Sequence, residues 1–100
     1  MPIMKVTEGR VRQGMWKDFE TAYKRVVDAP VPGLLARYLV WDIDDRDHGH
    51  SITIWESLEA MRSYQDSDLF QKTIQPALQP FFGNDSKTSV AEIALQKSSR

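Results

Sequence analysis

The segment Leu34–Ile43 constrains the fold more than any other part of the chain, because it is apolar in both of its alternating sets. One set consists of Leu34, Ala36, Tyr38 and Val40, and the other of Leu35, Arg37, Leu39, Trp41 and Ile43. A strand with one face in water carries a polar residue at every second position. The pattern therefore predicts a strand in a sheet that is covered on both faces.

The residues before this segment predict a strand followed by a helix. Ile3–Val11 is rich in β-branched residues, and Gly14 ends its pattern. From Met15 onward apolar side chains recur with helical spacing. They are Met15, Trp16, Phe19, Ala22, Tyr23, Val26 and Val27. The segment 28–33, with two prolines and a final glycine, should end this helix.

The residues after the central strand predict a hairpin and, near the end of the chain, a last strand. The segment 42–49 is rich in aspartate and is expected to form a solvated turn, which leads into a returning strand over His50–Glu56. A second turn is expected around residues 80–85. Thr88–Gln96 should close the sheet, and residues 97–100 should fray.

A second helical region is expected between the returning strand and the last one. Ser57 is the predicted N-cap of a helix that continues through Tyr64. Ser67 can cap a further helical segment, which Pro76 should end or kink.

This order of elements is β-α-β-β-α-β, the ferredoxin-like arrangement of an α+β domain. Both helices cover one face of a four-stranded antiparallel sheet, so residues 1–100 are expected to form a single domain. No segment remains to cover the other face of the sheet. A second copy of the chain is the simplest cover, and we expect a homodimer through the open sheet face.

Composition narrows the possible functions. The chain has no cysteine, which excludes disulfides, thiolate metal sites and a cysteine nucleophile. A net charge of -1 gives no electrostatic reason to expect a nucleic acid or an anionic membrane as partner. The apolar runs are too short for a membrane-spanning helix, and the first residues lack the pattern of a signal peptide. We therefore expect a cytoplasmic protein.

Several motifs resemble those of the antibiotic biosynthesis monooxygenase (ABM) family. They are Ile54–Met61, Tyr64, Ser67, Phe70, the segment 78–82, Trp16–Glu20 and the turn at Pro32 and Gly33. The resemblance covers nearly the whole chain and implies a dimeric α/β barrel. Members of the family include cofactor-independent oxygenases of polyphenolic substrates, quinol oxygenases and haem-degrading enzymes.

The resemblance implies a pocket between the sheet and the helices for a small aromatic, polyphenolic or quinol-type substrate. Such a substrate loses a proton and reacts with dioxygen itself, without a metal or other cofactor, while the protein orients it and handles protons. Trp55, Tyr64 and Arg37 are the candidate catalytic residues. The candidate substrate-binding residues are Trp16, Phe19, Tyr23, Tyr38, Ser51, Phe70 and Phe81.

Each catalytic candidate also has a structural interpretation. Trp55 and Tyr64 can simply pack in the core, and Arg37 can pair with an acid across the dimer interface. Ser51 stands where the oxygenases carry an asparagine partner for the tryptophan, and the only asparagine, Asn84, lies in an expected turn. A non-catalytic dimer that binds an aromatic ligand is therefore the alternative function.

The remaining candidates are two histidines and a group of aspartates in the expected hairpin turn. His48 and His50 could bind a metal or haem, but the sequence shows no third ligand, and a solvated turn is the simpler interpretation. The aspartates at 42, 44, 45 and 47 lack the spacing of a calcium loop. Haem degradation ranks third among the functions, because the first strand has no asparagine and the second helix no histidine.

Overall fold

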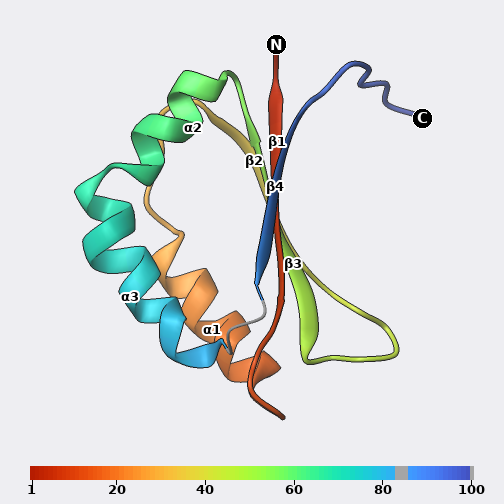
Figure 1. The fold of residues 1–100 in the computed structure, drawn as a ribbon, viewed down its shortest axis with the longest axis vertical. Coiled ribbons are helices and arrows are strands. Elements are labelled where there is room, and N and C mark those ends of the chain that lie inside the picture. Colours follow the sequence, from red (N-terminus) through yellow and green to blue (C-terminus); the bar gives the residue numbers. More distant parts are fainter. Residues whose placement is uncertain (83–85, 100) are drawn as a thin grey trace.

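The structure is a computed structural model that describes residues 1–82 and 86–99. Its main elements are β1 (Ile3–Arg10), α1 (Trp16–Val26), β2 (Leu34–Trp41), β3 (His48–Trp55), α2 (Leu58–Gln65), α3 (Gln75–Leu78) and β4 (Lys87–Glu92). The four strands form one antiparallel sheet in the order β2-β3-β1-β4. The helices lie together on one side of this sheet (Figure 1), which confirms the predicted ferredoxin-like fold.

The register of the strands assigns side chains to the two faces of the sheet. Arg37, Thr53 and Lys5 are paired neighbours on β2, β3 and β1, and they form a row on the helix-covered face. The next row, Tyr38, Ile52 and Val6, points the other way because successive side chains alternate. This second face, the open face, carries none of the helices that the structure describes (Figure 1).

The central strand is shorter than predicted and changes face once. β2 ends at Trp41, so Ile43 lies outside it and is 86% exposed. An irregularity in register between Leu34 and Ala36 inserts one extra residue against β3. Leu34 therefore packs against the core, whereas Leu35 is 58% exposed. From Ala36 onward the side chains alternate between the two faces as the sequence predicts.

Both predicted serine caps are present in the helical region. The Ser57 hydroxyl accepts a hydrogen bond from the backbone N–H of Ala60 at 3.1 Å, which fixes the start of α2. The Ser67 hydroxyl accepts from the N–H of Phe70 at 3.2 Å. These hydroxyls satisfy N–H groups that have no partner within their own helical turn.

The helical segment that Pro76 is expected to end or kink does not end there; it continues past this residue, and its hydrogen-bonding pattern changes at Gln75. Residues Leu69–Ile74 form a π-helical turn, and the N–H of Gln75 donates to the carbonyl of Phe70. Pro76 then lies in the first turn of α3, where a missing N–H costs no hydrogen bond. Helical structure continues through a short 3-10 turn, Gln79–Phe81.

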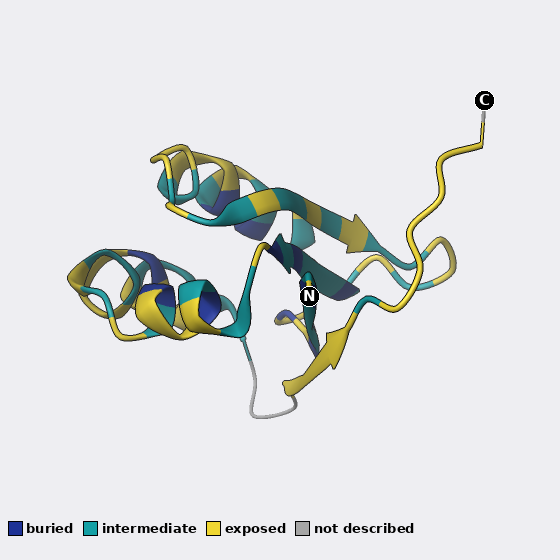
Figure 2. Cartoon of the chain, turned by 90° about the horizontal axis from the view of Figure 1, so that it is seen from above, coloured by how far each residue is buried: buried dark blue, intermediate teal, exposed yellow. Residues whose placement is uncertain are grey.

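The boundaries of β3 and β4 also differ from the prediction. β3 begins at His48, so both histidines belong to a strand and not to the turn. β4 ends at Glu92, and residues 93–99 have no regular secondary structure. Figure 2 shows β4 exposed along its length. The expected turn at residues 83–85, with Asn84, and the last residue of the expected tail fall outside the described residues.

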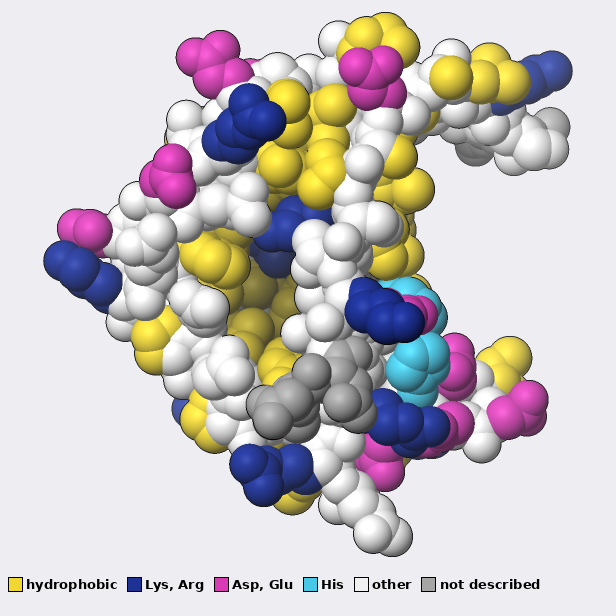
Figure 3. Space-filling model, viewed as in Figure 1, with side chains coloured by type: hydrophobic (Ala, Val, Ile, Leu, Met, Phe, Trp, Pro, Cys, Tyr) yellow, Lys and Arg dark blue, Asp and Glu magenta, His cyan; other side chains and the backbone are white. Residues whose placement is uncertain are grey.

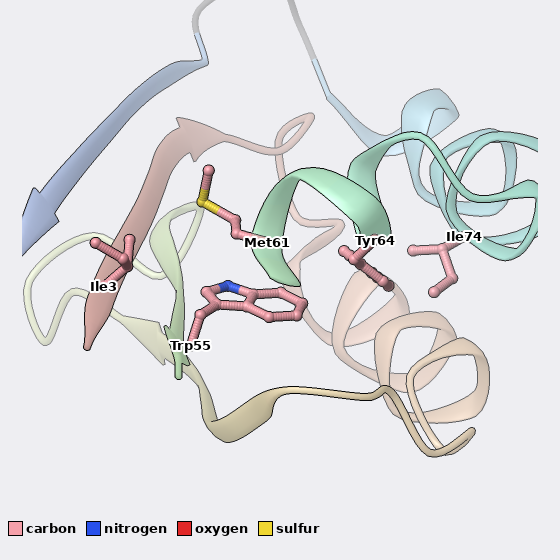
Figure 4. Packing of buried hydrophobic residues seen from close by; sticks show 5 residues of the cluster. All are labelled: Ile3, Trp55, Met61, Tyr64 and Ile74. Carbon is pink, nitrogen blue, oxygen red and sulfur yellow. The ribbon is translucent and has the colours of Figure 1, made fainter. Parts of the chain in front are cut away.

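Two buried clusters fix the helices to the sheet. One joins Ile3, Trp55, Met61, Tyr64 and Ile74, and it holds α2 and the π-helical turn against β1 and β3 (Figure 4). The other joins Val11, Phe19 and Tyr23, and it holds α1. Among the described residues, no helix is long and apolar enough to cross a membrane.

Candidate functional site

A cavity of about 370 Å³ lies between the helix-covered face of the sheet and the helices. The hollow is visible in Figure 3, with hydrophobic side chains on its walls. Its lining residues are Lys5, Thr7, Phe19, Tyr23, Arg37, Ser51, Thr53, Trp55, Tyr64, Gln65, Phe70, Ile74, Gln75, Leu78, Gln79, Phe82, Ser86 and Thr88. The volume suits a small aromatic molecule.

The floor of the cavity is polar although it belongs to the face that packs against helices. The row Arg37, Thr53 and Lys5 crosses three strands there, and Thr7 and Ser51 form the adjacent pair. A sheet face beneath helices is normally apolar. Polar side chains at these positions indicate a cavity built to receive a polar group.

Arg37 places a charged group in this cavity with part of its hydrogen-bonding capacity unused. Its Nη1 donates to Tyr23 Oη at 3.2 Å, and its guanidinium carbon lies 5.8 Å and 5.9 Å from the ring centroids of Tyr23 and Tyr64. Its Nη2 is buried and has no hydrogen-bond partner among the described residues. Burial alone would lower the pKa of Arg37, yet the two phenol groups beside it raise that pKa, so Arg37 stays charged.

Lys5 supplies a second cation from β1. Burial lowers the pKa of Lys5, and the charge of Arg37 lowers it further. The ammonium group lies 5.7 Å from the centroid of the Phe70 ring, a cation–π distance. The cavity thus holds one permanent cation and one amine that loses its proton more easily than an exposed lysine.

Trp55 and Tyr64 form an aromatic wall. Trp55 is 1% exposed, and its ring centroid lies 5.2 Å from that of Tyr64. The indole N–H donates to Thr53 Oγ1 at 2.8 Å, so it is already engaged within the protein. Tyr64 Oη is buried without a partner among the described residues. Burial raises the pKa of Tyr64, while Arg37 opposes this effect.

Tyr23 and Ser51 continue the polar network. Their hydroxyl oxygens are 2.7 Å apart, and Tyr23 also accepts from Arg37. The chain Ser51–Tyr23–Arg37 holds the guanidinium in place from α1 and β3. No carboxylate lines the cavity among the residues that the structure describes. Because the described lining residues give these two cations no carboxylate partner, the cavity favours a ligand that is anionic or becomes so.

The structure brings most of the predicted site residues together. Those that line the cavity are Arg37, Trp55, Tyr64, Phe19, Tyr23, Ser51 and Phe70. Trp16 packs edge-on against Trp41, and Phe81 packs on Phe19. Tyr38 is 55% exposed on the open face, because successive side chains of β2 point to opposite faces of the sheet and Arg37 points into the cavity. Arg37 lines the cavity and donates to Tyr23, on the face of the sheet opposite the open face.

Sequence reasoning missed several polar lining residues. They are Lys5, Thr7, Thr53, Gln65, Gln75, Gln79, Ser86 and Thr88. For β1 the sequence does contain a pattern that indicates a polar face, since Lys5 and Thr7 alternate with the apolar Met4 and Val6. With Met4 and Val6 on the open face, the polar set has to lie under the helices.

His48 and His50 lie on the face of the sheet opposite the cavity, since their register places them with Glu8 and Val40. The described lining residues of the cavity include no histidine. The cavity therefore offers no imidazole ligand to a haem iron from the residues that the structure describes.

Comparison with known proteins identifies the family. The model of the family "Antibiotic biosynthesis monooxygenase" matches residues 2–76. The chain belongs to this family. Among solved structures it is similar to SnoaB, a cofactor-independent oxygenase from Streptomyces nogalater, at 20% identity and a TM-score of 0.81 over 95% of each chain. A conserved protein from Methanosarcina mazei Go1 matches at 13% identity and a TM-score of 0.80 over 91% of each chain. No curated protein matches the sequence.

Proposed function

We propose that this ABM protein is a cofactor-independent monooxygenase that acts on a small aromatic, polyphenolic or quinol-type substrate with dioxygen. The observation that carries the proposal is the buried Nη2 of Arg37, which has no hydrogen-bond partner among the described residues, in an aromatic cavity that also holds Lys5. A phenol fits this site because its ring matches the walls and its oxygen becomes an anion during the reaction.

In this proposal the substrate supplies every electron. Neutral Lys5 accepts the phenolic proton, and Arg37 stabilises the phenolate. A ring carbon of the phenolate forms a bond to dioxygen, and the Lys5 ammonium returns a proton to the resulting peroxide. The O–O bond then breaks with loss of water, which leaves one oxygen atom as a quinone carbonyl. Phenol plus dioxygen gives quinone plus water, so no external reductant is needed.

Trp55 and Tyr64 have supporting roles in this scheme. The Trp55 ring orients the substrate, and its N–H fixes Thr53 so that the Thr53 hydroxyl proton is free to point at the substrate oxygen. Tyr64 keeps its proton because burial raises its pKa, and it can donate a hydrogen bond to the developing anion.

Oxygen consumption tests the proposal. Purified protein is mixed in air with a panel of hydroquinones and dihydroxynaphthalenes, and Arg37→Met and Trp55→Phe are compared with the native chain. We expect at least one substrate to be consumed, and Arg37→Met to lower the rate by a factor of about 100 or more. Arg62→Met, which removes an exposed arginine on α2, is the matched control and should keep the native rate.

The second candidate function is a binding protein for an aromatic ligand. It is favoured by the engaged Trp55 N–H and by Ser51, whose hydroxyl is already hydrogen-bonded to Tyr23. Quenching of tryptophan fluorescence by the same phenols, without oxygen consumption, would support this function and overturn the monooxygenase. Haem degradation is tested separately by a haem titration, and we expect no change in the Soret band.

We further propose that the chain works as a homodimer through its open face. Two rows of that face are apolar, Met4, Ile54 and Ala36 in one and Val6, Ile52 and Tyr38 in the next. The described helices all lie on the other face. Exposed apolar surface of this kind on a small domain favours association with a second copy.

A further inference from the structure

Glu8, His48 and His50 form a cluster at one end of the open face, away from the cavity. Glu8 on β1 is the direct partner of His50 on β3, and His48 lies two residues before His50 on the same strand face. One ligand atom of each residue lies within 4.8 Å of the others. The two histidines appear together in cyan in Figure 3, beside acidic and basic side chains.

The distances between the ligand atoms of this cluster are close to the distances between the ligand atoms around a bound metal ion. The His50 Nε2 and His48 Nε2 atoms are 3.2 Å and 3.6 Å from Glu8 Oε2. In a tetrahedral zinc site the ligand atoms, each about 2.1 Å from the metal, are roughly 3.4 Å apart. Small rotations of these side chains would therefore place all three around one ion.

A fourth residue orients the first histidine. Asp42 Oδ2 is within hydrogen-bond distance of His48 Nδ1, and the Asp42 backbone N–H donates to the carbonyl of His48. With Nδ1–H donated to this carboxylate, the lone pair of His48 is on Nε2, the nitrogen that faces Glu8. A carboxylate behind a metal-binding histidine is the usual second layer of zinc sites.

From this arrangement we infer that Glu8, His48 and His50 bind a divalent transition metal ion, with Zn²⁺ as the representative case. Two imidazoles and one carboxylate prefer such ions to Ca²⁺ or Mg²⁺, which take oxygen ligands. Three protein ligands leave at least one coordination position for water or a further ligand. The adjacent Arg10 is paired with Asp45, so its charge is partly balanced.

Metal titration of untagged, chelator-treated protein tests this site. We expect one equivalent of Zn²⁺ to bind per chain, Co²⁺ to give the visible absorption of a low-coordinate site, and Ca²⁺ to leave the protein unchanged. His50→Ala and Glu8→Gln should abolish binding. Asp42→Asn should weaken binding by a factor of about 10 to 100, because it removes only the orienting group.

The matched control is Asp44→Asn, which removes a negative charge from the same turn without touching the cluster and should keep native affinity. Circular dichroism and sedimentation on the same samples show that each variant is folded and in which oligomeric state. Absence of Zn²⁺ binding overturns the inference, as does full affinity in both His50→Ala and Glu8→Gln. Ca²⁺ binding in place of Zn²⁺ would assign the ion to the aspartates of the turn and overturn it too.

Discussion

Lys5 combines a charged side chain with a half-buried position above the Phe70 ring. Because its pKa lies below the ordinary 10.5, part of the amine becomes neutral at a pH where an exposed lysine is fully charged. If Lys5 is the base, the oxygenase rate should rise with pH through a midpoint below 10.5. Lys5→Met should remove this dependence, and a pH–rate profile checks it. An unchanged profile in Lys5→Met would rule out Lys5 as the base.

The same pKa shift makes a prediction about stability. The folded state holds the Lys5 proton less tightly than the unfolded chain, so stability increases as the pH rises through the folded pKa toward 10.5. At neutral pH the charged amine is therefore a cost to folding. Lys5→Met should raise the melting temperature at neutral pH while lowering activity. Lys17→Met, at an exposed position of α1, should change the melting temperature little.

The hydrogen bond from Trp55 to Thr53 is a residue-scale feature whose energy can be isolated. Trp55→Phe leaves the Thr53 hydroxyl without its donor and should destabilise the fold by about 2 kcal/mol. Thr53→Val removes the acceptor. The loss in free energy of unfolding of the double variant should be about 1 kcal/mol smaller than the sum of the losses in the two single variants, as measured by urea unfolding. Strict additivity would show that the 2.8 Å contact contributes nothing.

At the scale of elements, the turn before β2 depends on one glycine. Gly33 has a φ of 81°, and a Cβ there would lie 2.5 Å from the Cβ of Ala60 on α2. Gly33→Ala should therefore destabilise the fold by roughly 3 kcal/mol, from backbone strain and the clash together. Gly14 also has a positive φ, 75°, but open space around it. Gly14→Ala should cost only about 1 kcal/mol in the same unfolding assay.

The sequence predicts the order and type of the elements because each follows from periodicity and breakers that are local. It does not predict the bulge at Leu35, since an inserted residue is visible only against the partner strand. The π-helical turn before Pro76 is also missed, because the sequence shows that proline interrupts regular helical hydrogen bonding but not how the chain continues around it. The cavity is predicted in part. Its aromatic residues are predicted, and the alternation on β1 already separates Lys5 from Met4 and Val6, but the meeting of Lys5 with Thr53 requires the register of the sheet.

At the scale of the whole molecule, the two faces of the sheet carry different candidate sites. The helix-covered face holds the cavity, and the open face holds the apolar rows with the Glu8, His48 and His50 cluster at their end. A change on one face should therefore leave the function of the other intact, unless dimerisation shapes the cavity. A variant that stays monomeric but keeps the fold can separate these possibilities.

Ile52→Asp is that variant. Ile52 is the middle residue of the row between Val6 and Tyr38, and its neighbours on the opposite face are cavity residues that the change does not touch. A carboxylate at the centre of a dimer interface would lose its hydration without gaining a partner. We expect the native chain to sediment at twice its 11.5 kDa and Ile52→Asp at 11.5 kDa. The matched control, Gln71→Asp on the exposed side of the helical region, should remain dimeric. A native chain that sediments at 11.5 kDa at micromolar concentration would exclude the dimer, and the open face would then need a different partner.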